Sequence, residues 1–372
     1  MLPVTVSVPG KLILMGEHAV VYGRPALVAA VDLRLYARFS PCAPAAPLRI
    51  ELPGLSAGCA AGWPEILSYA REARERWEGY AARPGPETFQ SLRGTDPVHL
   101  VKVALGEAAA ALSATAGAGH ESPLDLRVES HLPMGSGMGS SAAAAVAVIA
   151  GYRLFRRSDL DLDLDLPEIL RLAHEVERRQ HGTPSGVDAA TVARGGLLWA
   201  YRERTPETPQ GGLAVEPLAV RSPLLQQIRV YDSGPPAETT GAVVAAVRER
   251  AARDPGRHER RLDRIGEATL GLRAELESAT FDPRRVVELI RAAAAGLHEL
   301  GVVPEAVQER IRQVEAAGGA AKISGAGALS GTSAGIVLAY HPEPDPLVRL
   351  PALALPQYPV HLGAAGLRRE ET

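Results

Sequence analysis

The sequence predicts a protein of two domains, each built from both strands and helices. At 372 residues, the chain is longer than one hydrophobic core usually supports. Short apolar runs that alternate with small or charged residues predict strands, and longer amphipathic or Ala-rich runs predict helices. Residues 203–224 are rich in Pro, Gln and Gly, which favours a domain boundary there. We therefore expect an N-terminal domain over residues 1–215 and a C-terminal domain over residues 216–372.

The first half is expected to begin with strands. Residues 4–8 alternate apolar and small polar side chains, and Pro9-Gly10 is expected to end this strand. Residues 124–131 alternate Leu and Val with charged residues, which predicts a half-buried strand leading into a glycine-rich loop. Other strands are expected at 11–15, within 26–35, at 48–52 and at 195–201, and helices over 65–80, over 98–115 and in the Ala-rich run that ends near Phe155.

An acidic run separates the Ala-rich helix from the next one. In residues 159–166, Asp alternates with Leu, a pattern that invites comparison with calcium sites. An EF-hand loop needs Gly at its sixth position and Glu at its twelfth, and these positions hold Leu164 and Leu170. We therefore expect a solvated linker, followed by a helix that begins at Pro167 and ends near Arg179.

The second half is expected to hold several helices and a few strands. Predicted strands cover residues 227–231 and 335–340, and the region near Val360 is one candidate for a last strand. The predicted helices cover residues 240–253, 259–278, 283–300 and 305–317.

Composition and charge argue against several classes of protein. A net charge of −3 gives no reason to expect a nucleic acid or an anionic membrane as a partner. No apolar run reaches the roughly 18 residues that span a bilayer, and the N-terminus lacks the features of a secretory signal. Cys42 and Cys59 are too few for a disulfide framework. We expect a reduced, cytoplasmic protein and leave its oligomeric state open, with a homodimer as one option.

The glycine-rich loop, Pro-Met-Gly-Ser-Gly-Met-Gly-Ser-Ser, precedes the Ala-rich helix. Its glycines, Gly135, Gly137 and Gly139, can adopt positive φ and let the backbone approach a ligand closely. Ser140 and Ser141 then open the helix, whose first N–H groups and dipole favour a phosphate. The spacing is neither G-x-x-x-x-G-K-[ST] nor G-x-G-x-x-G, so the loop alone is equally typical of an ordinary Ser-capped turn.

Four segments together resemble the GHMP small-molecule kinases. Residues 16–23, Gly-Glu-His-Ala-Val-Val-Tyr-Gly preceded by Pro-Gly-Lys, are similar to the first motif of that family. The glycine loop over residues 133–143 resembles the second motif, and residues 322–327 resemble the start of the third. Residues 181–188 resemble the catalytic segment. The four occur in the family's order, and the first is most similar to the branch that phosphorylates mevalonate.

The resemblance implies an α+β fold of two domains. The N-terminal domain would be a ribosomal-protein-S5-like α/β domain, and a ferredoxin-like C-terminal domain would close over the nucleotide. The implied reaction transfers the γ-phosphoryl group of ATP to the 5-hydroxyl of mevalonate, with Mg²⁺ as cofactor, in isoprenoid precursor synthesis.

The resemblance also assigns the reacting groups. Asp188 would face the substrate hydroxyl and accept its proton, and Lys11 would steady the developing negative charge. Ser141 and Glu177 would hold Mg²⁺, which needs few protein ligands. Without the resemblance, Asp188 is also typical of a turn, Lys11 of a solvated surface and Glu177 of a solvated helix face. For the neighbouring Glu175 we accept the solvated face.

Other residues are implied at the two substrates. Glu17 and His18 would bond mevalonate, directly or around the site, although a buried structural role is the alternative for His18. Thr239 matches a substrate-side Thr of the family. The implied phosphate-binding residues are Gly135, Ser136, Gly137, Met138, Gly139, Ser140 and Ser141, with Ser130 nearby.

Some positions depart from the family pattern. From Gly325 to Gly335 the third motif is longer and less glycine-rich than usual. Thr240 stands where the family often has Lys, and Gly54 where an adenine-side Asn is expected. These departures leave the nucleotide preference open and motivate an alternative of another class, a sensor that binds nucleotide and metabolite without turnover. The retained Lys11 and Asp188 argue against that alternative.

Within the family, phosphomevalonate kinase or another GHMP small-molecule kinase is the alternative function. A galactokinase is disfavoured because Ala19 follows His18, where sugar kinases have Thr. A diphosphomevalonate decarboxylase would not be expected to carry Gly-Glu-His in the first motif.

Overall fold

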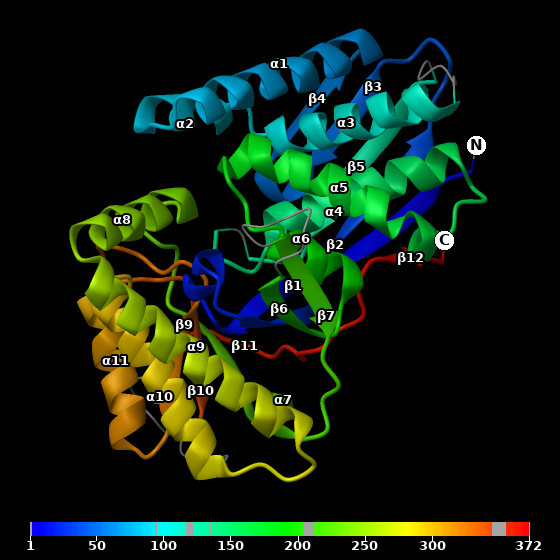
Figure 1. The fold of residues 1–372 in the computed structure, drawn as a ribbon. Helices are drawn as coiled ribbons and strands as arrows, with labels where there is room; N and C mark the ends of the chain where they lie inside the picture. The colour runs from blue at the N-terminus through cyan, green and yellow to red at the C-terminus, as the bar shows by residue number, and fades with distance from the viewer. Residues whose placement is uncertain are drawn as a thin grey trace.

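The computed structural model contains two β-sheets, each packed against its own group of helices (Figure 1). Both groups combine strands and helices, which confirms the expected α+β fold. No helix in the described part of the chain has both the length and the apolar composition needed to cross a membrane. The structure describes residues 2–93, 95–116, 122–133, 135–203, 212–343 and 355–371.

The first sheet has eight strands in its described residues. They are β1 (Val4–Met15), β2 (Ala26–Pro41), β3 (Leu48–Leu52), β4 (Ala57–Ala61), β5 (Leu124–Ser130), β6 (Leu197–Glu203), β7 (Gly212–Pro217) and β12 (Arg368–Glu370). The main path runs β12-β1-β2-β5-β3-β4, and β6 joins β2 to β7. The β3–β5 pair is parallel, whereas β1 and β2 form a long antiparallel pair.

Helices of the first half cover this sheet, and one of them is central. They are α1 (Trp63–Ala82), α2 (Pro86–Arg93), α3 (His99–Ala116), α4 (Ser140–Arg156), α5 (Leu162–His181) and α6 (Val187–Arg194), with the short 3₁₀ turns η1 (Ala19–Tyr22) and η2 (Pro53–Leu55). Every residue of α4 from Ala142 to Phe155 is buried. Small side chains suit this position because α4 packs on β1 and β2 and also on α3 and α5.

The second sheet has four antiparallel strands in the described residues. In spatial order they are β11 (Gln357–Tyr358), β8 (Arg229–Asp232), β10 (Ile336–Tyr340) and β9 (Ala320–Ser324), so β9 lies at an edge. The helices of this half are α7 (Leu224–Gln227), α8 (Thr240–Arg253), α9 (Pro255–Glu277), α10 (Pro283–Leu300) and α11 (Glu305–Ala316), and most of them gather around β8, β9 and β10 (Figure 1).

The chain passes between the two sheets more than once. The expected boundary segment includes residues 204–211, which lie outside the described residues, and the proposed division after residue 215 falls within β7. After β11, the chain returns to the first sheet, where β12 pairs with β1 (Figure 1). The division into residues 1–215 and 216–372 stays a proposal.

Pro9-Gly10 does not end the first strand, contrary to expectation. Instead β1 continues to Met15, with a shift of its register to β2 between these two residues. A Cβ on Gly10 would lie 2.4 Å from a side-chain carbon of Leu132. The glycine therefore admits a close neighbour at a bulge, and the strand proceeds.

The acidic run is also different from the expected solvated linker. Helix α5 begins at Leu162, so Pro167 lies inside it. Asp161 starts the helix by accepting a hydrogen bond from the backbone N–H of Asp163 at 2.9 Å. Asp165 accepts two hydrogen bonds from Arg153 of α4, at 2.5 and 2.6 Å. This largely buried ion pair joins two consecutive helices, and the local alternation of Asp and Leu does not reveal it. Elements that were not predicted are the helices α2, α6 and α7 and the strands β4, β7, β9 and β12.

Candidate active site

Lys11 and Asp188 form an ion pair between the first strand and α6. Lys11 lies in β1 with a buried side chain, and Gly186, with φ of 81°, precedes the turn of α6 that carries Asp188. The Nζ atom of Lys11 lies 3.1 Å from Oδ1 of Asp188. The side chain of Asp188 is 36% exposed, so this carboxylate also has access to a ligand.

Glu177 lies on α5 beside this pair. It is 3% exposed, and its Oε2 atom is buried without a hydrogen-bond partner. Burial, and after it the negative charge of Asp188, raises the pKa of Glu177 to about 8, although the charge of Lys11 opposes the shift. The carboxylate of Glu177 is buried, lies next to that of Asp188 and has one oxygen without a hydrogen-bond partner. These features favour the binding of a cation.

The glycine loop folds over Lys11. All three of its predicted glycines have positive φ, 74° at Gly135, 88° at Gly137 and 76° at Gly139. A Cβ on Gly139 would lie 2.7 Å from Cγ of Lys11, and the backbone N–H of Lys11 donates to the oxygen of Met138 at 2.9 Å. Gly139 precedes α4 without a side-chain cap. The positive end of α4 therefore lies next to the ion pair.

The serines of this region point to different partners. Ser136 donates to the oxygen of Pro133 at 2.9 Å, and Ser130 accepts from the backbone N–H of Leu132 at 3.1 Å. Ser141, in the first turn of α4, lies 3.2 Å from Nε2 of His181 at the end of α5. Met138 is buried, so its contribution at the loop is through its backbone.

Glu17 and His18 face the third motif. Glu17 accepts a hydrogen bond from Lys322 of β9, and Nε2 of His18 lies 2.9 Å from the oxygen of Ala326. Burial raises the pKa of Glu17 and lowers that of His18. Their roles at mevalonate stay predictions. Thr239 is exposed, and its Oγ1 accepts from a backbone N–H in the first turn of α8 at 3.3 Å.

The third motif packs on the glycine loop. Gly325, Gly327 and Gly335 have positive φ. A Cβ on Gly335 would lie 2.7 Å from the oxygen of Ser136. The irregular centre of the motif is held by Glu238, which accepts hydrogen bonds from the N–H of residue 329 and the hydroxyl of residue 330. The longer segment is thus ordered against both halves of the protein.

Sequence reasoning missed Lys322, Ser324 and His181 as site residues. Lys322 had one available signal, since the chain contains only three lysines and this one lies in a motif. Ser324 and His181 also lie within recognised segments, but their contacts with Ile13 and Ser141 join residues far apart in sequence. Contacts between residues so far apart cannot be predicted from the local sequence pattern.

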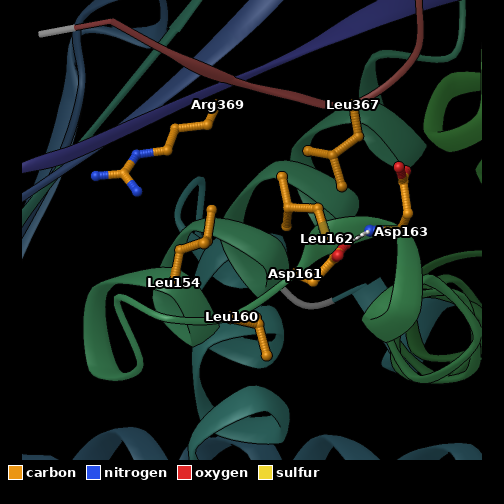
Figure 2. Close-up of a pocket in the computed structure, with 7 residues that line it drawn as sticks. All are labelled: Leu154, Leu160, Asp161, Leu162, Asp163, Leu367 and Arg369. Carbon is orange, nitrogen blue, oxygen red and sulfur yellow. Dashed lines mark hydrogen bonds between the residues drawn. The ribbon is translucent and has the colours of Figure 1, made fainter.

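A surface hollow of about 320 Å³ lies elsewhere (Figure 2). It opens at the far end of α4, where Leu154 faces the start of α5 and the returning C-terminal segment. At 1.5 Å per residue, Leu154 is about 20 Å along the helix from Ser141. The hollow is therefore separate from the groups described above. Its lining residues are Leu154, Leu160, Asp161, Leu162, Asp163, Leu367 and Arg369.

Comparisons with known proteins agree with this geometry. Residues 100–196 match the GHMP kinases N terminal domain. A mevalonate kinase of Pyrococcus horikoshii is 30% identical over 335 residues, which cover 87% of this chain and 86% of that protein. One from Archaeoglobus fulgidus is 30% identical over 321 residues, covering 86% and 88%. The crystal structure of the Methanococcus jannaschii mevalonate kinase shares the fold, with a TM-score of 0.70 at 17% identity, covering 96% and 98%.

Fold, site and comparisons together define an ATP-dependent small-molecule kinase. The matched segment contains the glycine loop, Glu177 and Asp188. The chain belongs to the mevalonate kinase family within the GHMP kinases.

Proposed function

We propose that this protein transfers the γ-phosphoryl group of ATP to the 5-hydroxyl of mevalonate. The observation that carries the proposal is the partly exposed Lys11–Asp188 pair beside the uncapped N-terminus of α4. The carboxylate of Asp188 suits an alcohol, and the N-terminus of α4 suits phosphates. The substrate itself is proposed from the names of the relatives.

Asp188 is proposed to accept the proton of the substrate hydroxyl. Its exposed fraction leaves room for a hydroxyl at the carboxylate, while Lys11 holds the side chain from within. In a loose transition state, positioning and charge neutralisation supply most of the catalysis. The ammonium of Lys11, fixed in a buried strand, is a preorganised positive charge of that kind.

The glycine loop and the first turn of α4 are proposed to bind the phosphates of ATP. Gly135 and Gly137 are exposed, so their backbone is accessible to a ligand. The N–H groups at the start of α4 and the helix dipole favour negative charge at this point.

The residues present fit a magnesium ion. The carboxylates of Glu177 and Asp188 lie close to the ammonium group of Lys11, and one oxygen of Glu177 has no hydrogen-bond partner. The described residues hold no group of three or more His, Cys, Asp or Glu that could bind a metal alone. Mg²⁺ needs few protein ligands, so Glu177 and Ser141 together with substrate phosphates would hold it. When bound, Mg²⁺ would neutralise charge on the phosphates.

The substrate is tested by mixing the purified protein with MgATP and measuring ADP release with mevalonate, phosphomevalonate, homoserine or a hexose. We expect turnover with mevalonate and little with the others. Turnover of phosphomevalonate without turnover of mevalonate would overturn the proposed substrate and retain the kinase class. The cytoplasm, expected from the sequence, stays the proposed compartment.

A further inference from the structure

A buried ion pair joins the first motif to the third, and its lysine has no role so far. Lys322 Nζ donates to Glu17 Oε1 and also to the backbone oxygen of Ile323 at 2.7 Å. The two charged side chains are 1% and 0% exposed. Burial lowers the pKa of Lys322 and raises that of Glu17, so burial opposes both charges. Such a pair adds little net stability, but loss of one partner leaves a buried charge uncompensated.

Lys322 is one of three alternate residues of the third motif that contact either the first motif or the end of β1 that leads into it. The hydroxyl of Ser324 donates to the oxygen of Ile13 at 3.0 Å and accepts from its N–H at 3.1 Å. Two residues further on, the oxygen of Ala326 contacts His18 at 2.9 Å. Alternate residues of an extended segment point to one side. Lys322 and Ser324 belong to β9, an edge strand of the second sheet, so their side chains lie on one side of it. Ala326 adds a contact through its backbone oxygen just beyond the end of the strand. We call these three contacts the seam.

The seam closes on a strained turn. His18 has φ of 57° and ψ of −43°, a conformation that residues with a side chain rarely adopt. Strained backbone of this kind persists only where its surroundings fix it. Here the contacts of the seam fix the backbone at His18, because Lys322 binds Glu17 and the oxygen of Ala326 contacts His18 itself.

The same turn acts on the reacting groups. The charge of Lys11 influences Glu17, and Lys11 in turn contacts Asp188 at 3.1 Å. A displacement of Glu17 would therefore change the shape of the turn that lies beside the reacting groups.

We propose that Lys322 is a positioning residue for the alcohol substrate, and that it acts by fixing the turn at residues 16–18 through Glu17. The proposal rests on the proposed function, in which this turn lies on the mevalonate side. The third motif then serves the alcohol side of the site in addition to the glycine loop on which Gly335 packs.

Two variants test the role of the charge. Lys322→Met keeps most of the length of the side chain without its charge, and the double variant Glu17→Gln/Lys322→Met removes both charges and leaves none unpaired. In both, we expect the KM for mevalonate to rise about 10- to 100-fold, while kcat and the KM for ATP change by less than about threefold. The KM values separate positioning of the alcohol from a general loss of structure.

Arg153→Met is the matched control. Arg153 forms a largely buried ion pair with Asp165 at the far end of α4, with exposed fractions of 8% and 12%. Its loss should lower the melting temperature and leave both KM values unchanged. An equal rise in the KM for mevalonate in this variant would overturn the proposal.

The remaining outcomes are also decisive. If Lys322→Met does not fold, the double variant is compared with Glu17→Gln, because Glu17 itself is assigned to the mevalonate side. Equal KM values for mevalonate in these two variants would support the proposal. A wild-type KM for mevalonate, a parallel rise of both KM values, or a KM in the double variant well above that of Glu17→Gln would overturn it. If the wild-type protein phosphorylates another alcohol, the proposed function fails, and the same comparison is made with that alcohol.

If the wild-type protein phosphorylates none of these alcohols, thermal unfolding of Glu17→Gln, Lys322→Met and the double variant decides. Strictly additive shifts in melting temperature would then overturn the pairing, and a double variant no less stable than Lys322→Met would support it.

Discussion

Two of the three lysines of this protein form ion pairs in the same region, but in opposite environments. Lys11 pairs with Asp188, whose side chain is 36% exposed, whereas Lys322 pairs with Glu17, whose side chain is fully buried. An accessible carboxylate can bind a substrate hydroxyl while it keeps its lysine partner, whereas a fully buried pair can only hold the backbone around it. Exposure therefore separates the pair that reacts from the pair that positions.

Substitution at Asp188 should give the largest effect. Asp188→Asn removes the proton acceptor and keeps the size of the side chain, so kcat should fall by about 10² to 10⁴-fold. The affinity for MgATP, measured by calorimetry, should stay close to that of the wild type, since Asp188 is assigned to the alcohol. A variant with near-wild-type kcat would remove Asp188 from the reaction.

Lys11→Met should lower kcat by about 10²- to 10³-fold, because it removes a preorganised charge from the transition state. Steady-state kinetics on this variant and on Lys322→Met sharpen the comparison. We expect loss of kcat at residue 11 and a raised KM at residue 322. The same kinetic pattern in both variants would contradict the division of roles between the two pairs.

Glu177→Gln should raise the Mg²⁺ concentration needed for half-maximal activity by about 10- to 100-fold. Its matched control is Glu175→Gln, two residues earlier on α5, whose carboxylate is paired with Arg178 and Arg179. The measurement is a Mg²⁺ titration at fixed total ATP. Equal shifts in the two variants would mean that Glu177 does not contribute to the metal site.

The smallest effect concerns His18 and acid stability. Burial lowers its pKa in the folded protein, so below about pH 6.5 the unfolded chain binds more protons at this residue. Its contribution to stability is present above that pH and is lost as the pH falls towards the folded-state pKa. His18→Gln should therefore weaken the loss of stability between pH 6.5 and 5.5, by at most about 1.4 kcal/mol per pH unit. Urea midpoints at several pH values measure it, and an unchanged pH slope would contradict it.

The sequence predicted most of the elements because their patterns are local. The Ala-rich helix, the long helix at Pro283–Leu300 and the positive-φ glycines of the loop follow from periodicity and from the conformational freedom of Gly. The α+β fold and the family came from motifs, and both are confirmed. The proximity of Lys11 to Asp188 was implied by the resemblance, and the structure brings the two together.

What the sequence did not reveal depends on contacts between distant residues. Lys322 and Glu17 are 305 positions apart in the sequence. Asp165 lies in an acidic run that looks solvated, but it pairs with Arg153 of the neighbouring helix. The register shift at Gly10 brings this glycine against Leu132, and the short strand β12 forms by pairing with β1. Each of these features is fixed by tertiary packing, which overrides the local pattern.

The most direct test of the account is to identify the product. The purified protein is incubated with MgATP and mevalonate, and the mixture is followed by ³¹P NMR. The account predicts one new phosphomonoester signal that grows in step with ADP, and no such signal with Asp188→Asn. Release of ADP without a phosphorylated alcohol, or an unchanged spectrum for the wild-type protein, would contradict it.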